Sequence, residues 1–147
     1  MSADPHDLAR FTSAQEEVYD HALAELQAGK KRNHWMWFVF PQFAGLGLSP
    51  TSQRYAIRSL EEARACLDHV VLGRRLRHCT EAVLAVEGST VTEIFGFPDD
   101  LKFRSSMTLF DHVSQAGSPF ARALDKFFES EPDPSTTSLL EQAGARQ

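Results

Sequence analysis

Residues 59–88, SLEEARACLDHVVLGRRLRHCTEAVLAVEG, decide the fold class of this 147-residue chain. Ser59 stands three residues before Glu62, the spacing of a capping box, in which each side chain accepts a hydrogen bond from a backbone amide at the start of a helix. From Leu72 onward apolar residues recur at three-and-four spacing as far as Gly88, and a glycine often follows the end of a helix. The stretch therefore predicts two central helices.

The same signals recur on both sides of this stretch. Capping boxes begin at Ser13 and Thr90, while Ser118 and Pro119 pair a cap with a first-turn proline. Apolar residues follow each signal at helical spacing: Val18, Tyr19, Ala22, Leu23 and Leu26 after the first, Val91 to Phe95 after the second, and Phe120, Leu124, Phe127 and Phe128 after the third. We expect the first of these helices to end at Gly29.

The remaining chain adds no sign of a sheet. Residues 131–137, which include two prolines, are expected to form a linker into a last short helix at 138–143, followed by a fraying tail. No segment alternates apolar and polar residues over the length of a strand. The sequence therefore predicts an all-α fold, a compact single domain of about six or seven helices over residues 1–147, with its core at about 7–130.

Composition narrows the classes of function. The chain carries 15 Lys and Arg against 20 Asp and Glu, and its net charge of −5 argues against general nucleic-acid binding. The chain contains no run of about 18 apolar residues, the length needed to span a membrane. The first ten residues hold no apolar signal core. We therefore expect a cytoplasmic protein with reduced thiols at Cys66 and Cys79. Neither these cysteines nor the six histidines show metal-ligand spacing, so no metal ion or other cofactor is expected.

Residues 34–43, HWMWFVFPQF, include five of the chain's fifteen aromatic residues. We expect a short buried helix that the proline ends, because a strand here would have no partner for its backbone amides. Most of these rings belong in a core, but a tryptophan is rarely buried completely, so one of Trp35 and Trp37 is expected to face a cavity and stack on a planar ligand. Gln42 is expected beside that cavity, whereas His34 fits either the cavity or the surface.

Residues 49–55, SPTSQRY, combine a helix cap, a first-turn proline and two further hydroxyl groups, those of Thr51 and Ser52. The free amides of a helix start, with Arg54 and Tyr55 nearby, suit a phosphate or pyrophosphate group. The alternative is ordinary capping beside a solvated arginine.

Residues 95–102, FGFPDDLK, deliver two adjacent carboxylates to the start of a helix. Side chains at adjacent helical positions point about 100° apart, so the pair cannot form a carboxylate dyad and only one of them can face a pocket. We expect Asp100 to be the catalytic carboxylate and Asp99 the helix cap beside it, with Lys102 contacting the ligand. The alternative is that one aspartate caps and the other pairs with Lys102 or solvent.

Several of these segments together resemble a small bacterial family known as domain of unknown function 1810, some members of which carry a calpastatin-like label. The segments that match are HWMWFVFPQ at 34–42, GLG at 45–47, SLEEA at 59–63, IFG at 94–96, PDDLK at 98–102 and SSMTLF at 105–110. The resemblance spans about residues 7–128 and implies a compact, mainly helical single domain, with no settled activity.

A second resemblance concerns residues 50–55, PTSQRY, which are similar to the Pro-Thr-Ser-Glu-His-Tyr segment of NADAR proteins, helical proteins that act on ADP-ribose derivatives. Gln53 stands where those proteins carry a catalytic glutamate, and Leu60 stands where they carry a functional lysine. A glutamine cannot act as a general base and a leucine cannot form a Schiff base. The resemblance therefore implies a related helical fold and a related pocket.

These observations lead to one main hypothesis. We expect a pocket that binds a nucleotide-like small molecule, with an ADP-ribose derivative as the candidate. The expected ligand-binding residues are Trp35, Trp37, Gln42, Thr51, Ser52, Arg54, Tyr55 and Lys102, and the expected catalytic residues are Asp100 and Asp99. The alternative is a non-enzymatic structural or partner-binding module in which the same residues form the core. The sequence leaves the ligand, the existence of an activity and the oligomeric state open.

Overall fold

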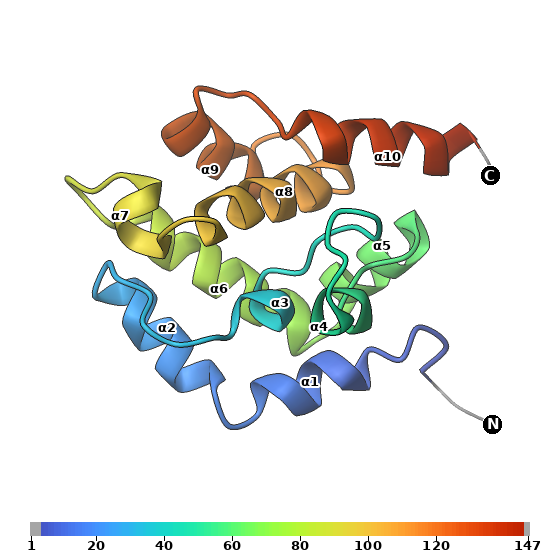
Figure 1. Cartoon of the computed structure of the whole chain (residues 1–147), viewed down its shortest axis with the longest axis horizontal. Helices are drawn as coiled ribbons and strands as arrows, with labels where there is room; N and C mark the ends of the chain where they lie inside the picture. Colours follow the sequence, from blue (N-terminus) through green and yellow to red (C-terminus); the bar gives the residue numbers. More distant parts are fainter. Residues whose placement is uncertain (1–3, 146–147) are drawn as a thin grey trace.

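The computed structural model describes residues 4–145, and within that range the chain forms ten helices and no strand (Figure 1). The helices are α1 (Ala9–Gln15), α2 (Tyr19–Gln27), α3 (Met36–Val39), α4 (Pro50–Arg54), α5 (Leu60–Asp68), α6 (Leu72–Leu84), α7 (Val91–Phe95), α8 (Asp99–His112), α9 (Pro119–Phe128) and α10 (Pro134–Ala145). The all-α prediction is confirmed. The helix count exceeds the expected six or seven, because α3, α4 and α7 are single short turns. The very start of the chain and the end of the expected fraying tail lie outside the described residues.

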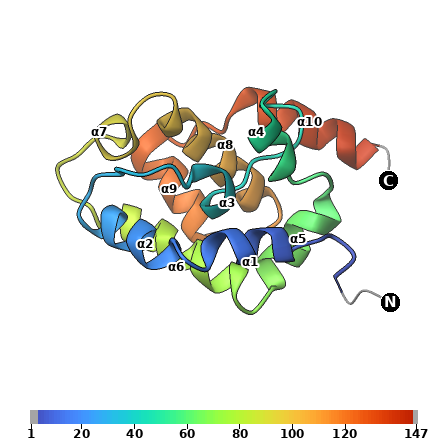
Figure 2. The same ribbon diagram turned by 60° about the horizontal axis from the view of Figure 1, so that its bottom comes forward.

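The helices pack in two layers, with α6 between them. Helices α8, α9 and α10 lie together along one side, and α1 and α2 lie along the other (Figure 1). Helix α6 packs against α2, α5 and α9 and so connects the layers, with α1 and α2 in front of it in Figure 2. None of the helices described has the length and apolar character needed to cross a membrane.

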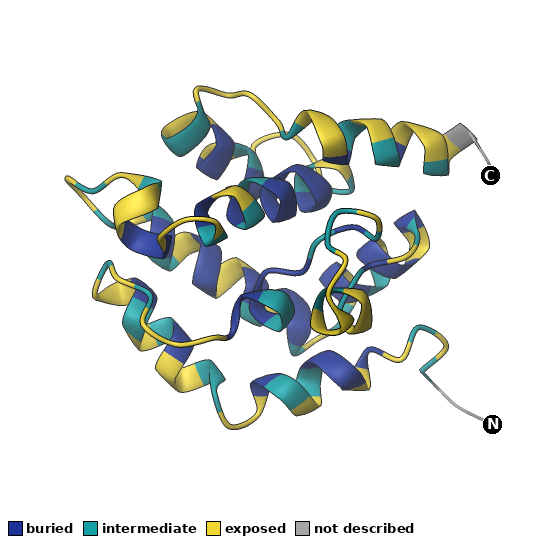
Figure 3. Cartoon of the chain, viewed as in Figure 1, coloured by how far each residue is buried: buried dark blue, intermediate teal, exposed yellow. Residues whose placement is uncertain are grey.

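The core follows α8 and the aromatic run before Pro41, as the dark-blue segments of Figure 3 show. The Phe103 ring of α8 is fully buried and contacts Phe40 edge-on at 5.0 Å and Phe95 face-on at 4.6 Å between ring centroids. Offset and edge-on pairs of this kind add stabilisation beyond the area that they bury. The run at 34–43 is thus a core element with a short helix at its centre, as expected.

Three of the predicted caps are confirmed. The hydroxyl of Ser59 accepts a hydrogen bond from the Glu62 amide at 3.0 Å, and the Ser118 hydroxyl accepts one from the amide of Ala121 at 3.1 Å. Thr90 heads a complete capping box with both reciprocal hydrogen bonds present. Helix boundaries that depend on neighbouring residues were therefore predicted correctly here.

The prediction of a cap at Ser13 is wrong, because Ser13 lies inside α1. The carboxylate of Asp4 accepts hydrogen bonds from the amides of Leu8 at 2.7 Å and Ala9 at 2.8 Å, which starts a helix upstream of the expected position. The helix that holds the predicted apolar residues, α2, begins separately after Val18 with no side-chain cap.

The last helix also begins earlier than expected, at Pro134 rather than at residue 138. The Asp133 carboxylate accepts hydrogen bonds from the amide of Thr136 at 3.0 Å and from its hydroxyl at 2.6 Å, which stabilises the first turn. Thr136 and Leu140 are buried, and α10 packs on α8. The C-terminal helix is therefore part of the packed domain.

Candidate functional site

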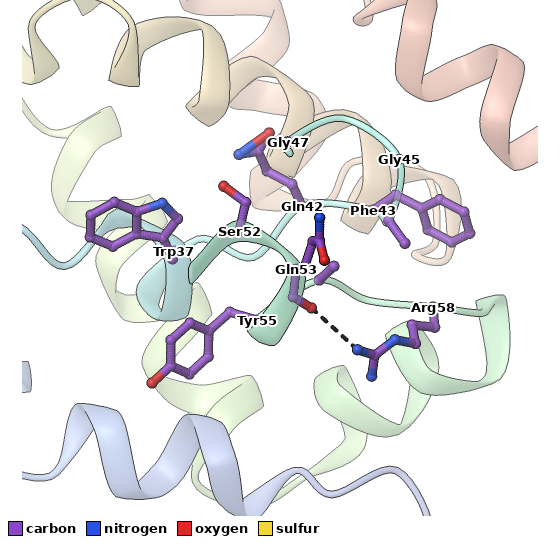
Figure 4. Close-up of a pocket in the computed structure, with 11 residues that line it drawn as sticks. Trp37, Gln42, Phe43, Gly45, Gly47, Ser52, Gln53, Tyr55 and Arg58 are labelled. Atoms are coloured by element: carbon purple, nitrogen blue, oxygen red, sulfur yellow. Dashed lines mark hydrogen bonds between the residues drawn. The ribbon is translucent and has the colours of Figure 1, made fainter. Parts of the chain in front are cut away.

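A cavity of about 190 Å³ lies beside α4 (Figure 4). Three stretches of chain surround it: the aromatic run, the loop that follows this run, and α4 with the segment leading into α5. The residues that line it are Trp37, Gln42, Phe43, Ala44, Gly45, Gly47, Ser52, Gln53, Tyr55, Ala56 and Arg58. The lining combines aromatic rings, amide and hydroxyl groups and one charged side chain, with no carboxylate among them.

One wall is the loop that packs tightly against α4. A Cβ atom on Gly47 would lie 2.6 Å from the Ser52 Cβ atom, so only a glycine allows the loop to come this close. The side-chain amide of Gln53 donates a hydrogen bond to the Leu48 carbonyl at 2.9 Å. Gln53 therefore connects this loop to the helix.

Another wall is the segment between α4 and α5. The Ala44 amide donates to the Ile57 carbonyl at 2.8 Å, and the Ile57 amide donates to the Gln42 carbonyl at 2.9 Å. These bonds form the parallel bridge between Phe43 and Ile57. Two stretches that are separated by α4 in the sequence are thereby held side by side, and both supply lining residues.

A buried ion pair supports this segment from behind. Arg10 of α1 donates from Nε to the Arg54 carbonyl and from Nη2 to the Ala56 carbonyl, each at 2.8 Å, and its Nη2 lies 2.5 Å from Glu62 Oε2. Glu62 Oε1 in turn accepts from the Arg58 amide at 3.1 Å. Both side chains are about 5% exposed, so the pair fixes the backbone of residues 54–58 from inside the protein.

The structure separates the two tryptophans. Trp37 lines the cavity, and the Lys102 ammonium nitrogen lies 5.3 Å from its ring centroid. Trp35 is buried, and its indole nitrogen donates a hydrogen bond to Glu25 Oε1 at 2.9 Å. Of the two candidates, Trp37 is therefore the one that lines the cavity.

Glu25 organises the stretch that enters the aromatic run. Partial burial by itself raises the pKa of Glu25, but hydrogen bonds from Arg32, Asn33 and Trp35 outweigh that effect and lower the pKa to about 2. All four of these hydrogen bonds are donated by N–H groups to the Glu25 carboxylate oxygens, so the charged form is favoured. This contact is structural and lies away from the cavity lining.

The predicted anion site at the start of α4 is only partly present. Ser52 and Tyr55 line the cavity, but Thr51 and Arg54 are exposed and do not. The Arg54 guanidinium lies 5.6 Å from the Tyr55 ring centroid instead. The Ser49 hydroxyl already accepts from the Ser52 amide at 3.1 Å, so one of the expected free amides is occupied.

Arg58 is the charged residue of the lining, and the sequence reasoning missed it together with Phe43, Ala44, Gly45, Gly47, Gln53 and Ala56. Its Nη2 donates to the Gln53 carbonyl at 3.2 Å, drawn as a dashed line in Figure 4. Its only sequence signal was its position immediately before the cap at Ser59, in the short turn after Tyr55.

Asp99 and Asp100 lie outside the cavity lining, and the assignment of Asp99 as the cap is wrong. Asp99 forms ion pairs with Lys31 at 2.9 Å and with Lys102 at 3.5 Å. Asp100 is buried, accepts from the Leu101 amide at 2.9 Å and accepts from the Thr92 hydroxyl at 2.6 Å. Asp100 therefore stabilises the helix start, because its side chain turns back toward the amides of α8 while Asp99 is held by a lysine from another part of the chain. Their catalytic role stays a prediction.

Metal-binding groups and reactive thiols were sought among the residues that the structure describes. No group of three or more His, Cys, Asp or Glu side chains there could hold a metal ion. Cys66 and Cys79 are free and buried, and burial raises the pKa of each thiol to about 12. Since the thiolate is the reactive form, both thiols are inert near neutral pH.

Residues 5–140 match a family described as "Protein of unknown function (DUF1810)". The chain belongs to the DUF1810 family. A solved structure, the crystal structure of the conserved hypothetical protein Rv1873 from Mycobacterium tuberculosis, is 53% identical and superposes with a TM-score of 0.92, covering 94% of this chain and 99% of that one. Comparison of this DUF1810 chain with curated proteins gives no match. The similarity to NADAR proteins stays a prediction, since none of these findings carries it.

Proposed function

We propose that this DUF1810 protein binds a small planar molecule of the nucleotide type in the cavity beside α4. The observation that carries the proposal is that Trp37 and Gln42 both line this cavity. An aromatic face suits stacking on a base, and a side-chain amide offers both a donor and an acceptor to the base edge. Within residues 4–145 the side-chain amide of Gln42 makes no hydrogen bond, so it is available to a ligand.

The size of the cavity restricts what it can enclose. Its volume of about 190 Å³ is below the ~300–1,000 Å³ that is usual for sites holding a whole drug-sized ligand. The cavity therefore encloses one part of a nucleotide-like molecule, and a larger ligand such as an ADP-ribose derivative extends beyond it. Trp35, Thr51 and Arg54 do not line the cavity and so leave the proposed contact set, which keeps Trp37, Gln42, Ser52 and Tyr55.

Catalysis is the second candidate function, and it rests on the neighbourhood of Trp37. Lys102 lies over the Trp37 ring and also pairs with Asp99, so a ligand that extends past Trp37 meets Lys102 and then the carboxylates. Any reaction at that point would depend on Asp99 or Asp100 in addition to the cavity. We also propose the cytoplasm as the place of action, because two free buried thiols suit a reducing compartment.

Thermal unfolding in the presence of adenosine, AMP, NAD and ADP-ribose tests the binding proposal. A ligand at about 100 times its dissociation constant adds about 2.7 kcal/mol of stability, which is readily measured. We expect Trp37→Leu to abolish the stabilisation by the ligand that binds. Phe97→Leu is the matched control, because Phe97 is an aromatic residue that is 77% exposed and lies outside the cavity lining, and it should leave the effect intact.

Two results would contradict the proposal. Absence of binding for all four compounds at millimolar concentration would remove the nucleotide-like class and leave the partner-binding module as the better account. Equal loss of ligand stabilisation in Trp37→Leu and Phe97→Leu would place the binding site elsewhere. Turnover that survives in both Asp99→Asn and Asp100→Asn would separately exclude those carboxylates from catalysis.

A further inference from the structure

The cavity lining contains a single charged side chain, that of Arg58. The guanidinium carries five donors, and its one hydrogen bond within residues 4–145 is the 3.2 Å bond from Nη2 to the Gln53 carbonyl. None of the ion pairs formed by the described residues includes Arg58, and no Asp or Glu lines the cavity. Arg58 is exposed, so its guanidinium lies at the open side of the cavity with free donors and without an ion-pair partner among the described residues.

The backbone around Arg58 holds this guanidinium in place. Its own amide donates to Glu62 Oε1 at 3.1 Å, and Glu62 is fixed by the buried pair with Arg10. The Gln53 carbonyl that receives Nη2 lies near the C-terminal end of α4, where carbonyl groups attract a cation. Arg58 is thus anchored at its backbone and at one edge of its guanidinium, and the other edge is free.

Trp37 and Arg58 lie on opposite sides of the labelled residues in Figure 4, with Gln42, Ser52 and Gln53 between them. In that view an aromatic ring, a set of amide and hydroxyl groups, and a guanidinium follow one another from left to right. A molecule with a planar group at one end and an anionic group at the other matches that order. This is the layout of a nucleoside monophosphate.

We propose that Arg58 binds the anionic end of the ligand, a phosphoryl group, while Trp37 contacts its planar end. This inference rests on the function proposed above and names the group that the ligand must carry. The planar fork of a guanidinium matches two phosphoryl oxygens, which favours Arg58 over a lysine at such a position. The inference also transfers the anion contact expected of Arg54 to Arg58, because Arg54 lies over Tyr55 and outside the lining.

Binding of AMP and adenosine, measured by calorimetry on the full chain, tests the phosphoryl contact directly. We expect AMP to bind about 10- to 100-fold more tightly than adenosine, the effect of one charge-assisted contact. Arg58→Gln should remove that difference, and Arg54→Gln, four residues away and outside the cavity, should preserve it. Equal affinities for the two compounds in the wild type, or equal effects of the two substitutions, would overturn the inference while leaving the binding function standing.

A second measurement does not depend on any nucleotide. Titration with inorganic phosphate, followed through the Nε–H resonances of Arg58 and Arg54, should give a saturating shift for Arg58 at lower phosphate concentration than for Arg54. Similar, non-saturating shifts for both would overturn the assignment of Arg58. If Arg58 saturates with phosphate but neither AMP nor adenosine binds, the nucleotide-like function fails and the anion contact of Arg58 remains.

Discussion

Removing the guanidinium of Arg10 should destabilise the protein more than any surface substitution. Arg10→Met deletes the donors that reach the carbonyls of Arg54 and Ala56, each at 2.8 Å, and leaves Glu62 in the interior without its counter-ion at 2.5 Å. Glu62 is about 5% exposed, so water cannot replace the lost partner. An uncompensated buried charge is the physical reason for the expected effect.

The expected size of this effect follows from the burial of the pair. Breaking a buried pair by removing one partner costs about 3–5 kcal/mol, a large share of the ~5–15 kcal/mol that stabilises a typical domain. For a domain of this size each 1 kcal/mol lowers the melting temperature by about 2–4 °C, so we expect a decrease of roughly 6–20 °C. Urea denaturation followed by circular dichroism would measure the loss.

A double-mutant cycle separates the ion pair from general packing. Replacing both partners, as in Arg10→Met with Glu62→Leu, removes the charge that would otherwise be stranded, so the double variant should recover at least about 2 kcal/mol relative to the sum of the single variants. A loss below about 1 kcal/mol for Arg10→Met, or additive losses in the double variant, would refute the reasoning.

Three further predictions follow from other contacts. The pKa of Glu25 is about 2 in the folded protein, against 4.5 for an ordinary glutamate such as that of the unfolded chain. The ionised Glu25 side chain therefore stabilises the folded protein above pH 4.5, and this stabilisation is lost as the pH falls toward 2. The urea midpoints of wild type and Glu25→Gln should therefore converge across that window. Gly47→Ala should lower the free energy of unfolding by about 1–3 kcal/mol, because its Cβ would lie 2.6 Å from the Ser52 Cβ atom, and adding Ser52→Gly should restore most of it. Cys66 and Cys79 should react with a disulfide reagent only as fast as the protein unfolds, since both are buried, and immediate reaction in native buffer would contradict this.

Capping residues in the sequence predicted several of the helix starts correctly. The hydroxyls of Ser59, Thr90 and Ser118 each cap a helix as expected, because these caps depend on residues within three positions. At Ser59 only this half of the predicted capping box forms, since the Glu62 carboxylate accepts from the Arg58 amide instead. The cap at Ser13 failed because Asp4, nine residues earlier, starts a helix that runs through it. Where two helix starts compete, the sequence pattern alone does not show which carboxylate or hydroxyl takes the free amides.

The sequence predicted the site residues that lie in recognisable local motifs. It did not predict those that reach the site only through contacts between segments that are apart in the sequence. Trp37, with Gln42 and Tyr55, was expected beside a cavity and lines one. Arg58 was missed because only the bridge between Phe43 and Ile57 brings its segment against the loop. Asp99 was misassigned as a cap because its main partner, Lys31, is distant in sequence.

Every residue that lines the cavity belongs to the single run 37–58. Most binding sites assemble from remote segments, so a change of ligand usually requires coordinated substitutions throughout a protein. Here the whole lining of the cavity is one cassette, residues 37–58, which Arg10 and Glu62 anchor to the surrounding helices. Transplanting this cassette between members of the family should carry ligand preference with it, while the helices around it stay the same.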